Sequence, residues 1–198
     1  MDRRHFLGGI GALPLLLSTP AVAAAPAATM SRTARKGLLP NVPLVTHQGR
    51  PVMFYDDLVR ERTVLLNFFL VQCTDGRCPT AMGNLRKAQD ILGERMGKDV
   101  FFLSITLQPL LDTPAALKSY AERFAPRPGW ELLTGKPQDV ERLRRGMGFF
   151  DPDPERDRDA NNHTGMGRYG NDKLERWGMV SLRSSPDNIA STFRWLSL

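Results

Sequence analysis

Two cysteines carry most of the chemistry that this 198-residue sequence can perform. Cys73 and Cys78 are its only cysteines, and four residues separate them. An apolar run precedes the first thiol and Pro79 follows the second, which is typical of a strand–loop–helix unit that presents thiols at the end of a strand. Such a pair can form a disulfide or bind one soft metal ion. The function therefore depends on which of these reactions the loop supports.

The loop between the thiols favours a functional pair over cysteines that only fill a core. It contains Asp75, Gly76 and Arg77, which argues against simple core packing. Arg77 and the N-terminus of the following helix both favour the thiolate form of Cys78. A disulfide that closes so short a loop constrains the unfolded chain little, so a purely structural bridge is the less favoured alternative.

Three histidines are available as further ligands. His5 lies near the N-terminus, and His47 lies in a predicted hairpin turn, where we expect an ordinary solvated side chain. His163 follows a long polar loop and precedes a predicted strand. Because a lone histidine is more often structural than a ligand, the residues by themselves leave the role of His163 open.

Predicted strands and helices alternate along the chain. Apolar runs predict strands at 42–45, 52–55, 63–70, 100–107 and 130–133, and a hairpin within 163–181. Helical spacing and capping residues predict helices at 79–96, 112–124 and 137–147, and one that starts at 185. Residues 151–162 are predicted to be an exposed loop. This order predicts an α/β, thioredoxin-like fold with a central mixed β-sheet flanked by helices and an N-terminal hairpin.

The first 25 residues have the features of a Tat-type signal peptide. Arg3 and Arg4 precede a mild apolar stretch and a small-residue cleavage site near Ala23 or Ala25. The stretch is short for a membrane span, which needs roughly 20 residues. We therefore expect export to the periplasm and a mature form that does not span the membrane. The predicted organisation is a signal peptide at 1–25, a flexible lead at 26–38 and one domain at 39–198.

Composition excludes several other classes of function. The formal net charge is +6, but the basic residues are dispersed, so no nucleic-acid binding is expected. The hydrophobic fraction of 41% supports a real core. The sequence contains no Gly-rich phosphate loop ending in Lys-Ser/Thr, no H-E-x-x-H and no G-x-S-x-G motif.

Several segments match a known family in the same order. They lie at 42–46, 49–52, 54–58, 78–80, 99–107, 112–117, 132–135 and 162–166. Through them the sequence resembles the Sco/SenC family of copper-binding thioredoxin-like proteins. The resemblance implies that Cys73, Cys78 and His163 bind one copper ion, and two thiolates with an imidazole suit Cu(I) and can also take Cu(II). It also implies a copper-accepting partner, such as a haem-copper oxidase subunit.

The cysteine spacing departs from that family, which usually has three residues between the thiols. The extra residue moves the second thiol along the turn, and Gly76 can absorb the altered backbone. Two functions follow as hypotheses. The first is a metallochaperone that helps to assemble a copper centre such as that of cytochrome c oxidase. The alternative is a thiol-disulfide oxidoreductase in which Cys73 and Cys78 are the redox residues, and this second function does not need His163.

Overall fold

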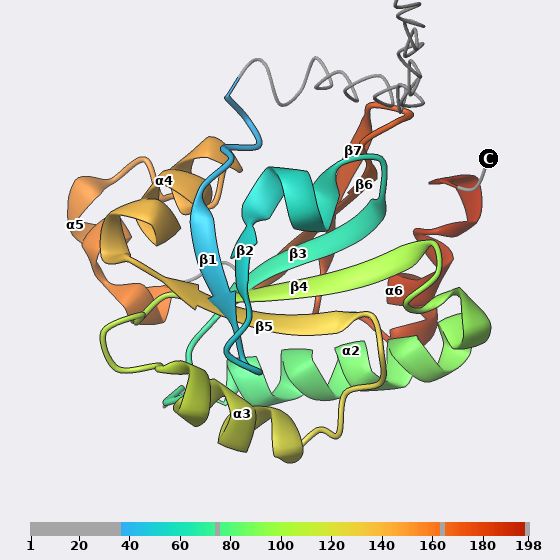
Figure 1. Ribbon diagram of the computed structural model, residues 1–198, viewed down its shortest axis with the longest axis horizontal. Coiled ribbons are helices and arrows are strands. Elements are labelled where there is room, and N and C mark those ends of the chain that lie inside the picture. The colour runs from blue at the N-terminus through green and yellow to red at the C-terminus, as the bar shows by residue number, and fades with distance from the viewer. Residues whose placement is uncertain (1–36, 74–75, 163–164, 197–198) are drawn as a thin grey trace, which may run out of the picture.

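A single seven-stranded sheet forms the centre of the molecule (Figure 1). The computed structural model describes residues 37–73, 76–162 and 165–196. The strand order is β2-β1-β5-β4-β3-β6-β7. The strands are β1 (Pro43–Thr46), β2 (Pro51–Met53), β3 (Thr63–Phe69), β4 (Val100–Thr106), β5 (Trp130–Gly135), β6 (Met166–Asn171) and β7 (Arg176–Ser181).

The three middle strands are parallel, and the strands that flank them are antiparallel. β3 pairs with β4 from Thr63 opposite Val100 to Phe69 opposite Thr106, and β4 pairs in parallel with β5. β3 is buried along its whole length, as a nearly continuous run of apolar residues predicts. The hairpins β1–β2 and β6–β7 complete the sheet on either side. The predicted α/β, thioredoxin-like fold with a mixed sheet and an N-terminal hairpin is confirmed.

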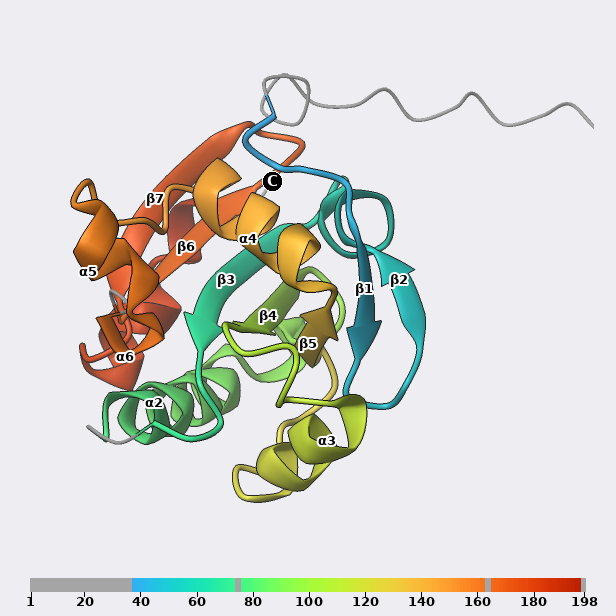
Figure 2. The same cartoon turned by 90° about the vertical axis from the view of Figure 1, so that its left-hand side faces the viewer.

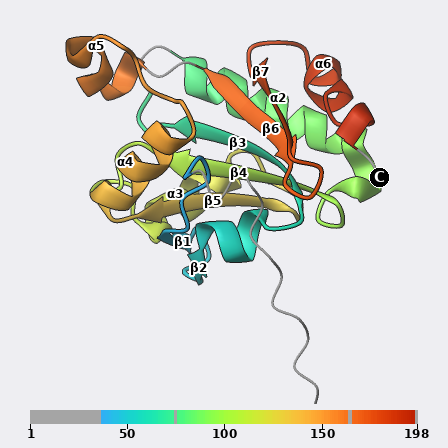
Figure 3. The ribbon, with the colours of Figure 1, turned by 90° about the horizontal axis from the view of Figure 1, so that it is seen from above.

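Helices cover both faces of the sheet (Figures 2 and 3). α2 (Arg77–Leu92), α3 (Pro114–Glu122) and α6 (Pro186–Ser191) pack on one face in a core cluster that includes Leu65. α4 (Pro137–Gly146) and the π-helical turn η1 (Phe54–Val59) cover the other face, where Val64 and Leu66 point. Neighbouring residues of β3 serve opposite cores because side chains alternate along a strand.

The predicted loop at 151–162 is only partly correct. It contains a short helix, α5 (Pro154–Arg158), and a 3₁₀ turn, η3 (Ala160–Asn162). The side chain of Asp153 accepts a hydrogen bond from the Glu155 N–H at 2.9 Å and so caps α5. Five helical residues are too few to give a clear period in the sequence, so composition alone suggested a loop.

One helix boundary differs from the prediction. α2 begins at Arg77 rather than at Pro79, which places Cys78 in its first turn. The second hairpin turns after Asn171, because the Asn171 side chain donates to the Thr63 hydroxyl at 2.7 Å and accepts from the Leu174 N–H at 2.8 Å. The signal peptide predicted at 1–25 lies outside the described residues. Within the described ranges, no helix combines the length and the apolar character that a membrane crossing requires.

Candidate functional site

The two thiols lie together at the carboxyl end of β3. The Leu70 N–H donates to Cys78 Sγ at 3.4 Å, and the Cys78 N–H donates to Cys73 Sγ at 3.2 Å. No disulfide joins the two cysteines. The two backbone N–H groups therefore hold both sulfurs in place at the end of the strand. The loop thus brings Cys73 and Cys78 into contact.

The two sulfurs differ in their exposure. Cys78 is only 2% exposed and belongs to the core cluster, whereas Cys73 is partly exposed and packs against that cluster. The expectation that the polar loop keeps both thiols out of the core is wrong for Cys78, because α2 starts early enough to turn it inward. Cys73 is therefore the sulfur that a partner molecule reaches first.

Gly76 provides the backbone geometry that leads from the loop into α2. It precedes the helix with a φ of +73° and a left-handed conformation, which glycine adopts without the steric cost that other residues meet. This position matches the expectation that Gly76 accommodates the longer cysteine spacing. Cys78 then lies in the first turn of α2.

The third predicted ligand, His163, lies outside the described residues. Its near neighbour Asn162 ends the η3 turn, and its side chain donates to the Arg156 carbonyl oxygen at 3.2 Å. Met166 begins β6 and packs against the core on the α4 face. Among the described residues, no group of three His, Cys, Asp or Glu side chains could hold a metal ion.

The prediction of a solvated His47 is wrong. This side chain is 8% exposed, and its Nδ1 accepts a hydrogen bond from the Leu132 N–H at 3.2 Å. Burial lowers the pKa of His47, although the nearby Glu131 carboxylate acts in the opposite direction. The error arose because the hairpin turn looked exposed, whereas β1 lies against β5 and brings the turn onto that strand. His47 therefore has a structural role.

Asp112 is a site residue whose contacts the sequence reasoning missed. It is 3% exposed, and its carboxylate accepts hydrogen bonds from the Thr106 hydroxyl and from the Val71 N–H. Burial raises the pKa of this carboxyl group, and the two hydrogen bonds oppose the shift. These contacts join the end of β4 to the thiol loop, the segment from Leu70 to Cys78 that carries both cysteines. The sequence pattern at 112–114 predicts only a helix cap. The Thr113 hydroxyl provides this cap by accepting a hydrogen bond from the Ala116 N–H at 3.3 Å.

Tyr120 is the second missed residue. It lies on α3, is 2% exposed and belongs to the same core cluster as Cys78. Its ring stacks on Phe69, with centroids 5.4 Å apart. The sequence predicted only that this position belongs to a helix.

A recess opens beside the thiol loop, at the carboxyl edge of the parallel strands. One hollow of about 430 Å³ has an apolar wall that includes Phe68, Leu107 and Phe149. A second hollow of about 470 Å³ is lined by Arg77, Asp153, Glu155, Arg156, Asp159 and Asn162. The two hollows share Asp159 and Asn162. Together they extend from the apolar wall to Arg77, the residue before Cys78. Open α/β sheets bind ligands at this edge.

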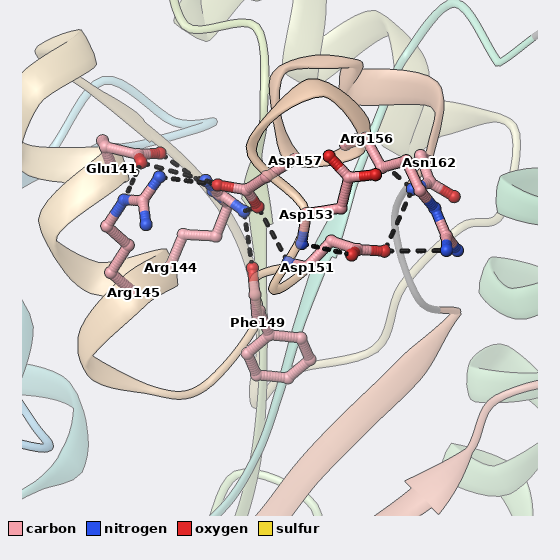
Figure 4. A network of polar contacts seen from close by, with 9 residues as sticks. All are labelled: Glu141, Arg144, Arg145, Phe149, Asp151, Asp153, Arg156, Asp157 and Asn162. Atoms are coloured by element: carbon pink, nitrogen blue, oxygen red, sulfur yellow. Dashed lines mark hydrogen bonds and ion pairs between the residues drawn. The ribbon is translucent and has the colours of Figure 1, made fainter.

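A network of ion pairs forms the polar wall of the first hollow (Figure 4). Arg144 donates to both oxygens of Asp157, at 2.6 and 2.9 Å, and also to Glu141 and to the Phe149 carbonyl oxygen. Arg145 contacts the same two carboxylates. The Arg144 guanidinium holds the pKa of Asp157 well below its usual range. The network fastens α5 to α4 and so fixes the segment that leads toward His163.

Comparison with known proteins gives a consistent family match. The family model described as SCO1/SenC matches residues 33–196. An SCO2-like protein of Rickettsia conorii is 31% identical over 135 residues, which are 67% of this chain and 62% of that protein. The chain spans less than two thirds of the length of the first relatives that it matches in sequence.

Solved structures share the fold. The copper-bound ScoI of Bradyrhizobium japonicum superposes with a TM-score of 0.64 at 22% identity, over 80% of this chain and 99% of that one. BsSco, a member of the Sco family of cytochrome c oxidase assembly proteins for which a disulfide switch is described, gives a TM-score of 0.62 at 18% identity, over 80% of this chain and 92% of that one. At these identities the likeness establishes the fold.

Proposed function

Because the chain belongs to the SCO1/SenC family, we propose that it binds copper and helps to assemble a copper centre such as that of cytochrome c oxidase. The observation that carries the proposal is the thiol pair, in which the Cys78 N–H contacts Cys73 Sγ at 3.2 Å at the carboxyl end of β3. Thiolate sulfur is the ligand type that selects Cu(I). The copper-bound relative and the oxidase assembly role of BsSco agree with this choice of metal and of process.

His163 is proposed as the third copper ligand. The residue before it, Asn162, lines the same hollow as Arg77, which is adjacent to Cys78. The described chain therefore comes near the thiol loop at Asn162, one residue before His163 in the sequence. An imidazole added to two thiolates gives a low-coordinate site that takes Cu(I) and also Cu(II).

Copper would leave this site by ligand exchange. Cys73 is the more exposed sulfur, so a thiolate of the recipient meets the metal on its side of the site. Cys78 is held in the core by α2 and the Leu70 N–H, so it stays bound to copper while the other ligands are exchanged. The recipient is proposed to be a haem-copper oxidase subunit, and the stepwise exchange needs no change in the fold.

We place this exchange in the periplasm. The support is the twin arginine and the small-residue cleavage site within residues 1–25. In an oxidising compartment the thiols need protection from disulfide formation, which bound copper would provide. Replacing Arg3 and Arg4 with lysine should abolish export, and continued export of that variant would contradict the Tat route.

The test of the copper site is the metal content and absorption spectrum of the reduced protein. One copper per chain and a thiolate-to-copper charge-transfer band are expected for the wild type. His163→Ala should change or remove the band, whereas Met166→Leu, a nearby packing change, should leave it intact. Copper retained equally by a Cys73→Ala, Cys78→Ala double variant would overturn the proposal.

Thiol-disulfide exchange is the second candidate function. One partly exposed and one buried cysteine in contact suit a pair in which Cys73 attacks a substrate disulfide and Cys78 resolves the mixed disulfide. The disulfide switch described for BsSco points in the same direction. This function predicts a reduction potential between about −120 and −270 mV, the range of known exchangers, and activity that survives His163→Ala. Loss of exchange in that variant would favour the copper function alone.

A further inference from the structure

The central sheet ends at β7 in an open edge, on the side where Figure 2 shows β7 beyond β6. Within the described ranges, β7 pairs only with β6, in a continuous register without a bulge. It contains no proline, and its only charged residue is Arg176 at its start. Proteins usually protect edge strands with prolines, bulges, charges or short length. The opposite edge strand, β2, is protected in this way, because it has three residues and begins with Pro51.

The ladder to β6 leaves alternate main-chain groups of β7 directed outward. The Leu182 N–H donates to the Gly165 carbonyl oxygen at 3.0 Å. Hydrogen-bonded pairs alternate along an antiparallel ladder, so this bond and the register direct one set of residues toward β6, namely Arg176, Gly178 and Val180. The other set directs its N–H and C=O groups away from β6 and consists of Trp177, Met179 and Ser181. The open stretch ends where the Ser184 N–H donates to the Ser181 carbonyl oxygen at 3.1 Å.

Apolar side chains are exposed beside this edge. Met179 is 45% exposed, although it lies within the strand. Trp177 lies on the same face of β7 and packs against the core cluster on the α4 face. Trp195 is 46% exposed, and its carbonyl oxygen accepts from Arg176 at the start of β7. Open main-chain groups with exposed apolar side chains next to them mark an interaction surface.

We propose that β7 pairs with β7 of a second copy of this chain in antiparallel orientation, so that the two sheets become one. In the register centred on Met179, every outward residue meets an outward residue of the other copy. The two Met179 residues exchange both main-chain hydrogen bonds, and each Ser181 N–H donates to the Trp177 carbonyl oxygen of the other copy. The two Met179 side chains then cover each other. The surface is therefore self-complementary, as a two-fold interface requires.

The charges at the two ends of β7 favour a second copy as the occupant. Glu175 directly precedes the strand, and Arg183 follows its end. Each lies four positions from Met179 in the sequence. Pairing centred on Met179 therefore brings Glu175 of each copy beside Arg183 of the other. Opposite charges at facing positions stabilise paired strands, and here the pair occurs at both ends.

This pairing leaves both thiol sites accessible. β7 runs parallel to β3, because both strands are antiparallel to β6. The second copy runs in the opposite direction, so the two thiol loops lie at opposite edges of the joined sheet. The inference therefore goes beyond the proposed function and depends neither on copper nor on the chemistry of the cysteines.

Sedimentation of the purified protein over the micromolar range tests the pairing. We expect the wild type to form a dimer. Met179→Lys and Met179→Glu should each raise the dissociation constant about tenfold or more, because like charges then face each other across the two-fold axis. An equal mixture of these two variants should recover the dimer, because opposite charges then face each other. Recovery requires folded chains, so it separates a loss of pairing from a loss of folding.

The matched control is Leu110→Lys. Leu110 is also an exposed apolar residue, but it lies in the loop after β4, outside β7. We expect this variant to associate like the wild type. A wild type that stays monomeric over the whole range would overturn the proposal and leave the edge to an extended segment of another protein. Association that survives in Met179→Lys, disappears in Leu110→Lys or is not recovered in the mixture would overturn it as well.

Discussion

The thiol loop and the α4–α5 network stand at the same edge of the sheet, but different forces hold them. The sulfurs of Cys73 and Cys78 are held by backbone N–H groups, and the core surrounds Cys78. The segment that leads toward His163 is held by ion pairs centred on Arg144 and Asp157. Backbone contacts inside a core respond little to salt, whereas partly exposed ion pairs are weakened by it. Added salt should therefore weaken the contacts that hold the segment before His163 more than the contacts that hold the two sulfurs.

The largest expected effect on stability is that of Arg144→Ala. Its partner Asp157 has only 5% of its side chain exposed, so the change leaves a nearly buried carboxylate with Arg145 as its remaining cation. Because breaking a buried ion pair costs more than the pair contributes, we expect a loss of about 2–3 kcal/mol in the free energy of unfolding. Urea denaturation measures it.

Arg142→Ala is the control for that variant. Arg142 lies on the same helix, forms no ion pair in the part of the chain that the structure describes, and should change stability by less than about 0.5 kcal/mol. A similar loss in both variants would show that helix propensity, rather than the network, is responsible.

Asp112→Ala should cost about 2 kcal/mol. It leaves the Thr106 hydroxyl and the Val71 N–H without their acceptor in a buried place. Because Val71 belongs to the thiol loop, the variant should also expose Cys78, and its alkylation by a thiol reagent should accelerate at least severalfold. An alkylation rate equal to that of the wild type would mean that Asp112 does not hold the loop.

The two cysteines should differ when each is replaced by serine. Cys78→Ser places a hydroxyl in the core and should destabilise the protein by about 1–2 kcal/mol. Cys73→Ser lies at a partly exposed position and should cost less than about 0.5 kcal/mol. Both variants should lose copper binding. Equal melting temperatures for the two would contradict the unequal burial of the pair.

The smallest effects are those of pH, and they have opposite signs in the two regions. The pKa of Asp157 is lowered in the folded state, so its stabilising contribution is complete above the ordinary carboxyl pKa of about 4 and is lost as the pH falls below it. The difference in stability between the wild type and Arg144→Ala should therefore narrow in acid.

At Asp112 the pKa is raised in the folded state, so folding favours the protonated form. The contribution of this group is most favourable at acid pH and declines as the pH rises through the unfolded and then the folded pKa. Asp112→Asn, which cannot ionise, should thus gain stability relative to the wild type between acid and neutral pH. Melting curves of both proteins at several pH values measure this gain. Its absence would contradict the assignment of a buried charge at Asp112.

Local sequence patterns were sufficient to predict the fold and the two cysteines of the site. The apolar run of β3, the apolar run of β4 and the thiol pair that follows β3 are all features of contiguous residues, and hydrophobic periodicity reports them directly. α5 escaped prediction because its short length gives no period and its stability comes from ion pairs with α4.

The sequence by itself determined that two thiols lie close together after a buried strand, because the six consecutive residues from Cys73 to Cys78 form one short segment. Only the tertiary structure decided that Cys78 is buried while Cys73 is partly exposed, and that His47 is a packing residue. It also decided that Asp112 contacts the Val71 N–H and that Tyr120 belongs to the same buried cluster as Cys78. These facts depend on contacts between residues far apart in the chain, such as Phe69 with Tyr120. Burial is a property of the whole packed sheet and its helices, and no local pattern contains it.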